Sequence, residues 1–86
     1  MEKKHVLLVL LKKRKSTAVN VQKVLTDWGC LIKTRLGIHD GVLNHCSETG
    51  LIILELVGTD KQKKDLAKKL TVIPGVDTKL VELTVK

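Results

Sequence analysis

Two short apolar runs constrain the fold of this chain more than any other feature. The first, VLLVLL, spans residues 6–11, and the second, LIILELV, spans residues 51–57. Successive side chains of a β-strand point to opposite faces, so a strand that is apolar at both parities must be covered on both sides. Glu55 is the one charged residue in the two runs. We therefore predict that the first run is a buried strand and that the second is another strongly apolar strand.

The stretch between the two runs predicts a helix followed by a strand. Ser16 or Thr17 can serve as an N-cap, after which apolar residues recur at helical spacing, and Gly29 is suited to end the helix. Residues 30–39 then alternate loosely between apolar and polar side chains, as in a strand with one covered face. We expect Cys30, at the start of this strand, to be a small core residue.

The stretch after the second run predicts another helix and another strand. Residues 59–62, TDKQ, have the form of a capping box, in which side chains and backbone amides satisfy each other at a helix start. Apolar residues then recur at helical spacing up to the turn signal Pro74-Gly75. The sequence VDTKLVELTV, residues 76–85, predicts the last strand.

The order of these elements is β-α-β-β-α-β, which is that of the α+β, ferredoxin-like fold. It predicts a four-stranded antiparallel sheet with both helices on one face. The chain has 86 residues, and we expect residues 1–86 to form a single domain. Because Trp28 is the only aromatic residue, the core must be built from aliphatic side chains.

Two helices can cover only one side of four strands. Whichever set of alternate residues in the two runs faces the helices, at least five or six large aliphatic side chains remain on the other face. Leaving these side chains exposed to water would cost roughly 10 kcal/mol of hydrophobic stabilisation. Such a patch normally marks an interface. We therefore predict a homodimer or homotetramer, formed sheet to sheet or by strands paired edge to edge. Lys33 and Arg35 are expected on this face, with Glu55 as the partner of Arg35 within the chain or across subunits.

The charge balance is basic, with 16 Lys and Arg residues against 9 acidic ones. Lys13, Arg14 and Lys15 precede or open the first predicted helix, where an anion is favoured; the alternative is a solvated basic loop. Direct recognition of DNA is not expected, because such proteins usually add stacking aromatics or a recognition helix. The apolar run near the start is too short for a membrane span or a usual secretory segment, which predicts a cytoplasmic protein.

No catalytic motif accompanies this pattern. The six glycines all stand singly, so no phosphate-binding glycine loop is formed, and the nine acidic residues are scattered along the chain. The Ser, His and Asp residues occur in no nucleophile-elbow context. We therefore expect that the protein is not an enzyme.

His39, His45 and Cys46 are the candidate ligands for a divalent transition metal, nickel or zinc. Their spacing matches no compact metal motif, so a metal site would need ligands from two subunits, with His5 as a further candidate. Two alternatives remain open. Arg35 and His39 can instead take part in a small-ligand site or an interface, or these side chains can be polar residues of a hairpin loop.

Three segments, VQKVLTDWGCLIKTRLGIHD, GLIILELVG and IPGVDTKLVEL, resemble regulators of the iron-only hydrogenase system. The resemblance covers residues 4–85, and RLGIH and GLIILEL are its most specific parts. It implies a ferredoxin-like fold of the ACT kind, similar to the C-terminal sensing domain of nickel-responsive repressors, which hold metal at a sheet-to-sheet interface through histidines and a cysteine. One departure is the turn KKRKSTAV, which lacks the glycine of amino-acid-binding ACT domains.

The function that this resemblance implies is a ligand-sensing regulatory module that acts as a homo-oligomer. Its link would be to the expression or maturation of the iron-only hydrogenase. Since we expect no DNA-binding domain, it would act through another regulatory or maturation protein. The alternative is a structural or assembly subunit that binds no small molecule.

Overall fold

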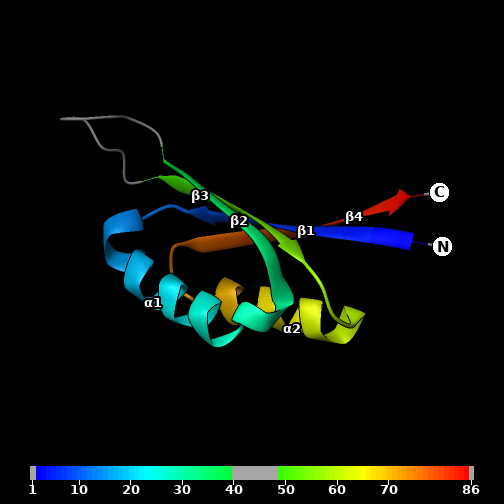
Figure 1. Ribbon diagram of the computed structural model, residues 1–86. Helices are drawn as coiled ribbons and strands as arrows, with labels where there is room; N and C mark the ends of the chain where they lie inside the picture. Colours follow the sequence, from blue (N-terminus) through cyan, green and yellow to red (C-terminus); the bar gives the residue numbers. More distant parts are fainter. Residues whose placement is uncertain (1, 40–48, 86) are drawn as a thin grey trace.

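The computed structural model describes residues 2–39 and 49–85. The chain forms four strands and two α-helices in the predicted order (Figure 1). The elements are β1 (Glu2–Leu11), α1 (Arg14–Asp27), a 3₁₀ turn (Gly29–Leu31), β2 (Ile32–His39), β3 (Gly50–Leu56), α2 (Asp60–Thr71) and β4 (Val76–Val85).

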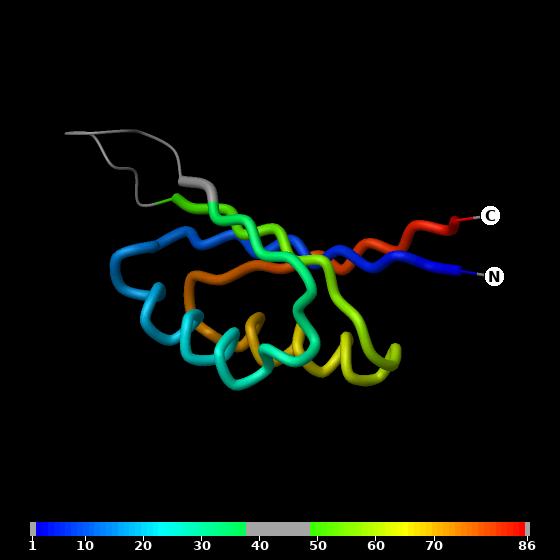
Figure 2. Tube along the Cα trace, viewed as in Figure 1, coloured from blue at the N-terminus to red at the C-terminus, as the bar shows by residue number. Residues whose placement is uncertain are grey.

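All neighbouring strands are antiparallel, and the strand order is β2-β3-β1-β4. The two doubly apolar runs form strands, as predicted, and the structure places them at the centre of the sheet. Both helices lie on the same side of the sheet, and the N- and C-termini come out together at one end (Figures 1 and 2). The fold is α+β and ferredoxin-like. No helix among the described residues has the length and apolar character needed to cross a bilayer.

The core lies between the sheet and the helices and is aliphatic. Alternate residues of β1 point into it, so Leu7 and Val9 are fully buried while their neighbours are only half-buried. Helix α1 contributes Val21 and Leu25 to the core. The other buried hydrophobic residues are Leu11, Ile52, Leu54, Leu56, Leu66, Leu70 and Val76. Trp28 packs against this cluster from the end of α1, as a packing residue.

Helix α1 begins earlier than its sequence predicts. Arg14 is its first residue and Lys13 its N-cap, which makes no side-chain capping bond. The hydroxyl groups of Ser16 and Thr17 instead donate back to the carbonyl oxygen of Lys13, at 3.1 and 3.0 Å. A hydroxyl that bonds to a carbonyl three or four residues earlier is compatible with a position inside the helix, so the predicted cap at Ser16 or Thr17 was wrong.

Helix α2 begins as predicted. The side chain of Thr59 accepts a hydrogen bond from the amide of Gln62 at 3.1 Å, and the side chain of Gln62 accepts one from the amide of Thr59 at 2.8 Å. This reciprocal pair is the capping box. The turn that follows the helix uses Gly75 at φ 84°, a conformation that glycine adopts without steric cost.

The end of α1 differs from the prediction at two positions. Gly29 does not adopt the left-handed conformation of a helix-ending glycine; Trp28 is the C-cap, and the chain continues directly into the 3₁₀ turn. Cys30 lies in that turn and is exposed, so its assignment to the core was wrong. The physical reason is that Cys30 falls in the 3₁₀ turn, before β2 and its alternation toward the core begin at Ile32.

A β-bulge between Ile32 and Thr34 interrupts the pairing of β2 with β3. Before the bulge, Ile32 lies opposite Leu56 and packs against the core. A bulge opposes two residues of one strand to one of its partner, so every later side chain of the strand changes face relative to a regular alternation.

This bulge reverses the faces predicted for the second half of β2. Leu36, expected toward the core, points to the open face and is 52% exposed. Arg35 and Gly37, aligned with Leu54 and Ile52, lie instead on the side of the helices. The composition of both faces of the sheet depends on this single irregularity.

Candidate functional site

The face of the sheet that the helices leave open carries a continuous apolar patch. At its centre, Leu8 of β1 lies opposite Ile53 of β3, and Leu36 of β2 lies opposite Ile53 on its other side. Val81 of β4 extends the patch beside Val6 of β1. The eight residues of this open-face patch are Val6, Leu8, Leu10, Leu36, Leu51, Ile53, Val81 and Leu83.

The patch is accessible in the isolated chain. Leu36 and Leu83, near its two ends, are 52% and 55% exposed, and the residues between them are half-buried by their own neighbours. The prediction that five or six large aliphatic side chains remain outside the helical layer is thus confirmed. A surface of this kind is the strongest candidate for an interaction site on the molecule.

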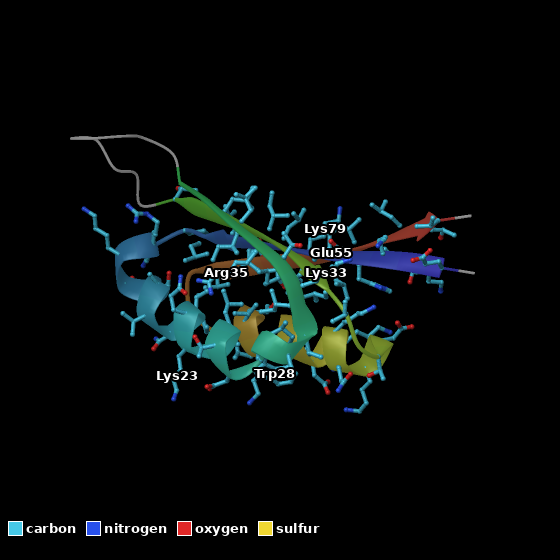
Figure 3. All side chains as sticks on the ribbon, viewed as in Figure 1. Lys23, Trp28, Lys33, Arg35, Glu55 and Lys79 are labelled. Carbon is cyan, nitrogen blue, oxygen red and sulfur yellow. The ribbon has the colours of Figure 1, made fainter. Side chains whose placement is uncertain are left out.

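Charges of both signs flank the open-face patch. Glu55 lies on this face within 3.6 Å of the amine of Lys4 and 4.0 Å of that of Lys33. Near the opposite edge, Lys12 and Asp77 form an exposed pair at 3.8 Å, and Lys79 also lies on the open side (Figure 3). A surface with both signs can complement a second copy of itself.

Arg35 does not belong to this face, contrary to the prediction. Its guanidinium group donates a hydrogen bond to the side-chain oxygen of Gln22, and it lies between β2 and α1 (Figure 3). Since Glu55 aligns with Thr34, Arg35 and Glu55 project from opposite sides of the sheet. The predicted pairing of Arg35 with Glu55 within one chain was therefore wrong, because the bulge moves Arg35 to the helical side.

The predicted metal ligands are only partly covered by the structure. β2 ends at His39, while His45 and Cys46 lie outside the described residues. Within residues 2–39 and 49–85, no group of three or more His, Cys, Asp or Glu side chains is placed to hold a metal ion. The nickel or zinc site stays a prediction, which calorimetry with Ni(II) and Zn(II) under reducing conditions tests.

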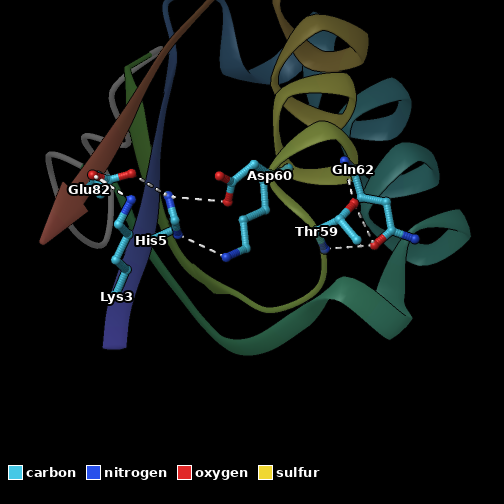
Figure 4. A network of polar contacts seen from close by, with 7 residues as sticks. Lys3, His5, Thr59, Asp60, Gln62 and Glu82 are labelled. Carbon is cyan, nitrogen blue, oxygen red and sulfur yellow. Dashed lines mark hydrogen bonds and ion pairs between the residues drawn. The ribbon is translucent and has the colours of Figure 1, made fainter. Parts of the chain in front are cut away.

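His5, the further candidate for a shared metal site, is used elsewhere. It is only 5% exposed and points to the helical side of the sheet, away from the open face. Its Nδ1 atom lies 2.8 Å from the amine of Lys63, and its Nε2 atom lies 3.1 Å from a carboxylate oxygen of Glu82 (Figure 4). The carboxylate of Asp60 is 3.9 Å from Nε2.

These contacts indicate the hydrogen-bond role of each ring nitrogen of His5. An ammonium group can only donate, so Nδ1 accepts from Lys63 and Nε2 carries the proton that is donated to Glu82. Lys63 is 7% exposed, and its neighbours on the same side of α2 are the core residues Leu66 and Leu70. We call the buried pair His5 and Lys63, together with the exposed carboxylates of Glu82 and Asp60 that meet it, the buried polar network; it joins β1, β4 and the start of α2.

Sequence reasoning missed this network, although a signal for it exists. His5 has the same parity as Leu7 and Val9 in β1, and Lys63 lies on the apolar face of α2. Two polar residues at inward positions on neighbouring elements predict a pair, because buried polar groups are almost always hydrogen-bonded.

The three basic residues at the start of α1 do not converge on one point. The backbone carbonyl of Lys13 accepts the bonds from Ser16 and Thr17. Arg14 alone of the three contributes to a cavity between α1 and the sheet, whereas Lys15 is exposed and lies outside that lining. The anion site at Lys13, Arg14 and Lys15 stays a prediction, and Arg14 is the residue of the three that lines a described cavity.

The fold and the open-face patch define a class of protein: a small ferredoxin-like protein with one uncovered apolar sheet face. No protein-family profile and no curated protein matches the chain. Among solved structures, it is similar to the uncharacterised protein TM1266 from Thermotoga maritima, with 26% identity, a TM-score of 0.80, and coverage of 96% of this chain and 100% of the other.

Two more distant similarities concern the fold alone. CPII from Thiomonas intermedia K12, a nitrogen regulatory PII-like protein bound to ADP, AMP and bicarbonate, is 11% identical at a TM-score of 0.60, covering 99% of this chain and 97% of CPII. A dimeric ferredoxin-like protein from an uncultured marine organism is 8% identical at a TM-score of 0.55, covering 99% and 98%. These similarities support a ferredoxin-like, PII-like fold and do not confirm the hydrogenase-regulator family.

Proposed function

We propose that this protein is a non-enzymatic regulatory module that acts as a homo-oligomer through the open face of its sheet. The open-face patch carries this proposal. Its side chains stay half-exposed in one chain and become buried only against an apolar partner. We propose a second copy of this chain as that partner.

Three properties of the open face favour a second copy as the occupant. Four strands about 4.8 Å apart, the longest of ten residues, give the face on the order of 600 Å², comparable with the roughly 800 Å² that each partner contributes to a standard interface. Around the patch, Glu55 and Lys79 provide charges of opposite sign, which a two-fold axis can bring together. A similar fold is found in a dimeric ferredoxin-like protein.

The regulatory part of the proposal has two supports. One is the similarity of fold to CPII, a nitrogen regulatory PII-like protein. The other is the sequence resemblance to regulators of the iron-only hydrogenase system, from which we propose the expression or maturation of that enzyme as the regulated process. With Trp28 as its single aromatic residue, the chain offers little for base stacking, so we propose that it acts on a partner protein.

Sedimentation velocity at low micromolar concentration tests the oligomeric state. We expect the wild-type chain to sediment as a dimer or tetramer, and Leu8→Lys and Ile53→Lys, which place a charge at the centre of the patch, to sediment as monomers. Val19→Lys is the matched control, because Val19 is 77% exposed on α1, on the other side of the molecule. It should leave the oligomer intact.

A folded wild-type monomer at these concentrations contradicts the proposed interface. Circular dichroism of Leu8→Lys separates loss of assembly from loss of folding. Equal dissociation by Val19→Lys would also contradict the assignment of the interface to the open face.

A further inference from the structure

A cavity of about 250 Å³ lies between α1 and the end of the sheet formed by β2 and β3. Most of its lining is on the helical side, between the layers, and it shares only Leu51 with the open-face patch. The lining residues are Leu11, Arg14, Ala18, Gln22, Gly37, Gly50, Leu51 and Ile52. Three of these, Ala18, Gly37 and Gly50, have little or no side chain. A helix and a sheet normally pack against each other through large apolar residues at such positions.

The cavity exists because side chains are missing, with no backbone strain involved. A Cβ atom placed on Gly37 would meet no heavy atom within 4 Å, and Gly37 is not among the residues with positive φ. The bulge in β2 puts this glycine opposite the buried Ile52, under α1, where a larger residue would have completed the core. The space is therefore ready for a ligand, and it can be filled by a single substitution.

The electrostatic surroundings of the cavity favour an anion. Arg14 is part of the lining, and Arg35 is held beside it by its bond to Gln22. Among the residues that the structure describes, none that lines the cavity is acidic, and the first turn of α1 contains no acidic residue. A guanidinium group has five N–H donors, so Arg14 can bind a carboxylate while it keeps another contact.

We propose that this cavity binds a small aliphatic carboxylate, with its carboxylate on Arg14 and its hydrocarbon chain against Leu11 and Ile52. The volume of about 250 Å³ lies below the roughly 300–1,000 Å³ of sites for drug-sized ligands, which favours a ligand smaller than a nucleotide. An amino acid fits less well than a simple acid, since Gln22 offers the one side-chain oxygen of the lining and already accepts from Arg35. An ammonium group would also lie beside two arginines, whose like charges repel it.

This inference deepens the proposed function by naming a ligand class, and it rests on that function only for what binding would regulate. Binding itself does not depend on the open-face interface. A negative titration with an intact oligomer overturns the carboxylate site alone, whereas a monomer that binds the carboxylate overturns only the oligomeric proposal. The two failures are therefore distinguishable.

An NMR titration of the full chain with isovalerate tests the site. We expect saturable shifts at the backbone amides of Gly37 and Gly50. Two matched probes test the effects of the negative charge and of an added ammonium group on affinity. Isovaleramide has the same shape but lacks the charge, and L-leucine has the carboxylate and the branched chain together with an ammonium group. Both should bind at least about tenfold more weakly than isovalerate.

Three variants locate the ligand. Gly37→Leu should abolish the shifts by filling the cavity, and Arg14→Gln should weaken binding by about tenfold or more. Lys15→Gln is the control, because it removes a neighbouring charge that lies outside the lining, and its affinity should match the wild type. Ala18→Met fills the cavity from the opposite wall should Gly37→Leu fail to fold.

The absence of saturable shifts with isovalerate overturns the proposal. Binding that survives both Gly37→Leu and Ala18→Met also overturns it, because the ligand would then lie elsewhere. Equal weakening by Lys15→Gln and Arg14→Gln would show a general attraction of anions to a basic surface and would likewise overturn the site.

Discussion

The two ends of the layer between helices and sheet are completed in opposite ways. Under the start of α2, the buried polar network of His5 and Lys63 fills the space with hydrogen-bonded polar side chains (Figure 4). Under the start of α1, Gly37 and Ala18 leave the space empty beside Arg14. The same βαβ arrangement thus accommodates a closed polar contact at one end and a cavity at the other.

The difference teaches how the fold divides structural and binding roles. In the network, His5 and Lys63 satisfy each other, and no buried side-chain nitrogen or oxygen among the described residues lacks a partner. These bonds join β1, β4 and α2. The other end has no such pair of side chains, and its open space is where we propose that a ligand binds.

The largest effect is expected in the buried polar network. His5→Leu removes the acceptor of Lys63 and leaves a buried ammonium group unpaired, which should lower the free energy of unfolding by about 3 kcal/mol. Lys63→Met leaves only a neutral ring nitrogen unsatisfied and should cost about 1 kcal/mol. Urea denaturation of both variants measures the difference.

A double variant sharpens this test. His5→Leu combined with Lys63→Met replaces both partners by apolar side chains and should be more stable than His5→Leu alone. If the double variant loses the full sum of the two single effects, the two residues do not interact energetically and the network has no structural role.

An effect of intermediate size is expected from alanine substitutions of two glycines, one before α2 and one beside α1. A Cβ atom on Gly58, before α2, would lie 2.8 Å from both the Gln62 side-chain oxygen and a methyl carbon of Leu31, and its φ is 107°. Gly58→Ala should therefore lower the free energy of unfolding by about 1–2 kcal/mol. Gly37→Ala meets no atom and should raise it by up to about 0.5 kcal/mol, because the unfolded chain loses freedom.

Thermal unfolding of the two alanine variants measures the expected loss of stability in Gly58→Ala and the expected gain in Gly37→Ala. Serine at the same positions is a suitable check, since it has a Cβ of the same placement with a polar end. Destabilisation by Gly37→Ala equal to that by Gly58→Ala would mean that the space under α1 is not open.

The smallest effect is expected at a surface pair on α2. The amine of Lys61 bonds to Asp65 at 2.9 Å, and this hydrogen bond holds the pKa of the Asp65 carboxyl below its ordinary value of 3.8. A carboxyl group with a lowered pKa stabilises the fold above its unfolded pKa, and that contribution is lost as the pH falls through the folded value.

Lys61→Gln removes this bond and should raise the pKa of Asp65, which a carbon-detected NMR titration measures directly. The difference in stability between Lys61→Gln and the wild type should be small at neutral pH, because the pair is solvated, and should vanish in acid. A pKa of Asp65 that is unchanged in Lys61→Gln contradicts the assigned cause.

Much of the fold follows from residue patterns alone. The two doubly apolar runs are β1 and β3, and TDKQ forms the capping box that opens α2. The capping box depends on residues that are close in the sequence, and the apolar runs depend on the number of apolar residues. Both can be read from the sequence. The start of α1 was misplaced because Ser16 and Thr17 can bond either forward as caps or backward to Lys13, and local sequence does not choose between the two.

The candidate sites were less predictable. The sequence showed that one sheet face must stay apolar and exposed, and it indicated Arg14 as an anion contact. It did not show the cavity, since that depends on which face Gly37 occupies, and it did not pair His5 with Lys63, which are 58 residues apart. His45 and Cys46 lie outside the described residues, so their role as metal ligands stays a prediction.

Residue types and spacing were sufficient for the order of the elements, the aliphatic core and the surplus of apolar surface, because burial depends on composition and periodicity. The β-bulge between Ile32 and Thr34 required the folded chain, since it arises where two strands distant in sequence pair. By shifting the strand by one residue, it turned Leu36 outward onto the open-face patch and placed Gly37 under α1. A shift of one position exchanges the faces of every later side chain, so the positions of the interface and the cavity were decided only in three dimensions.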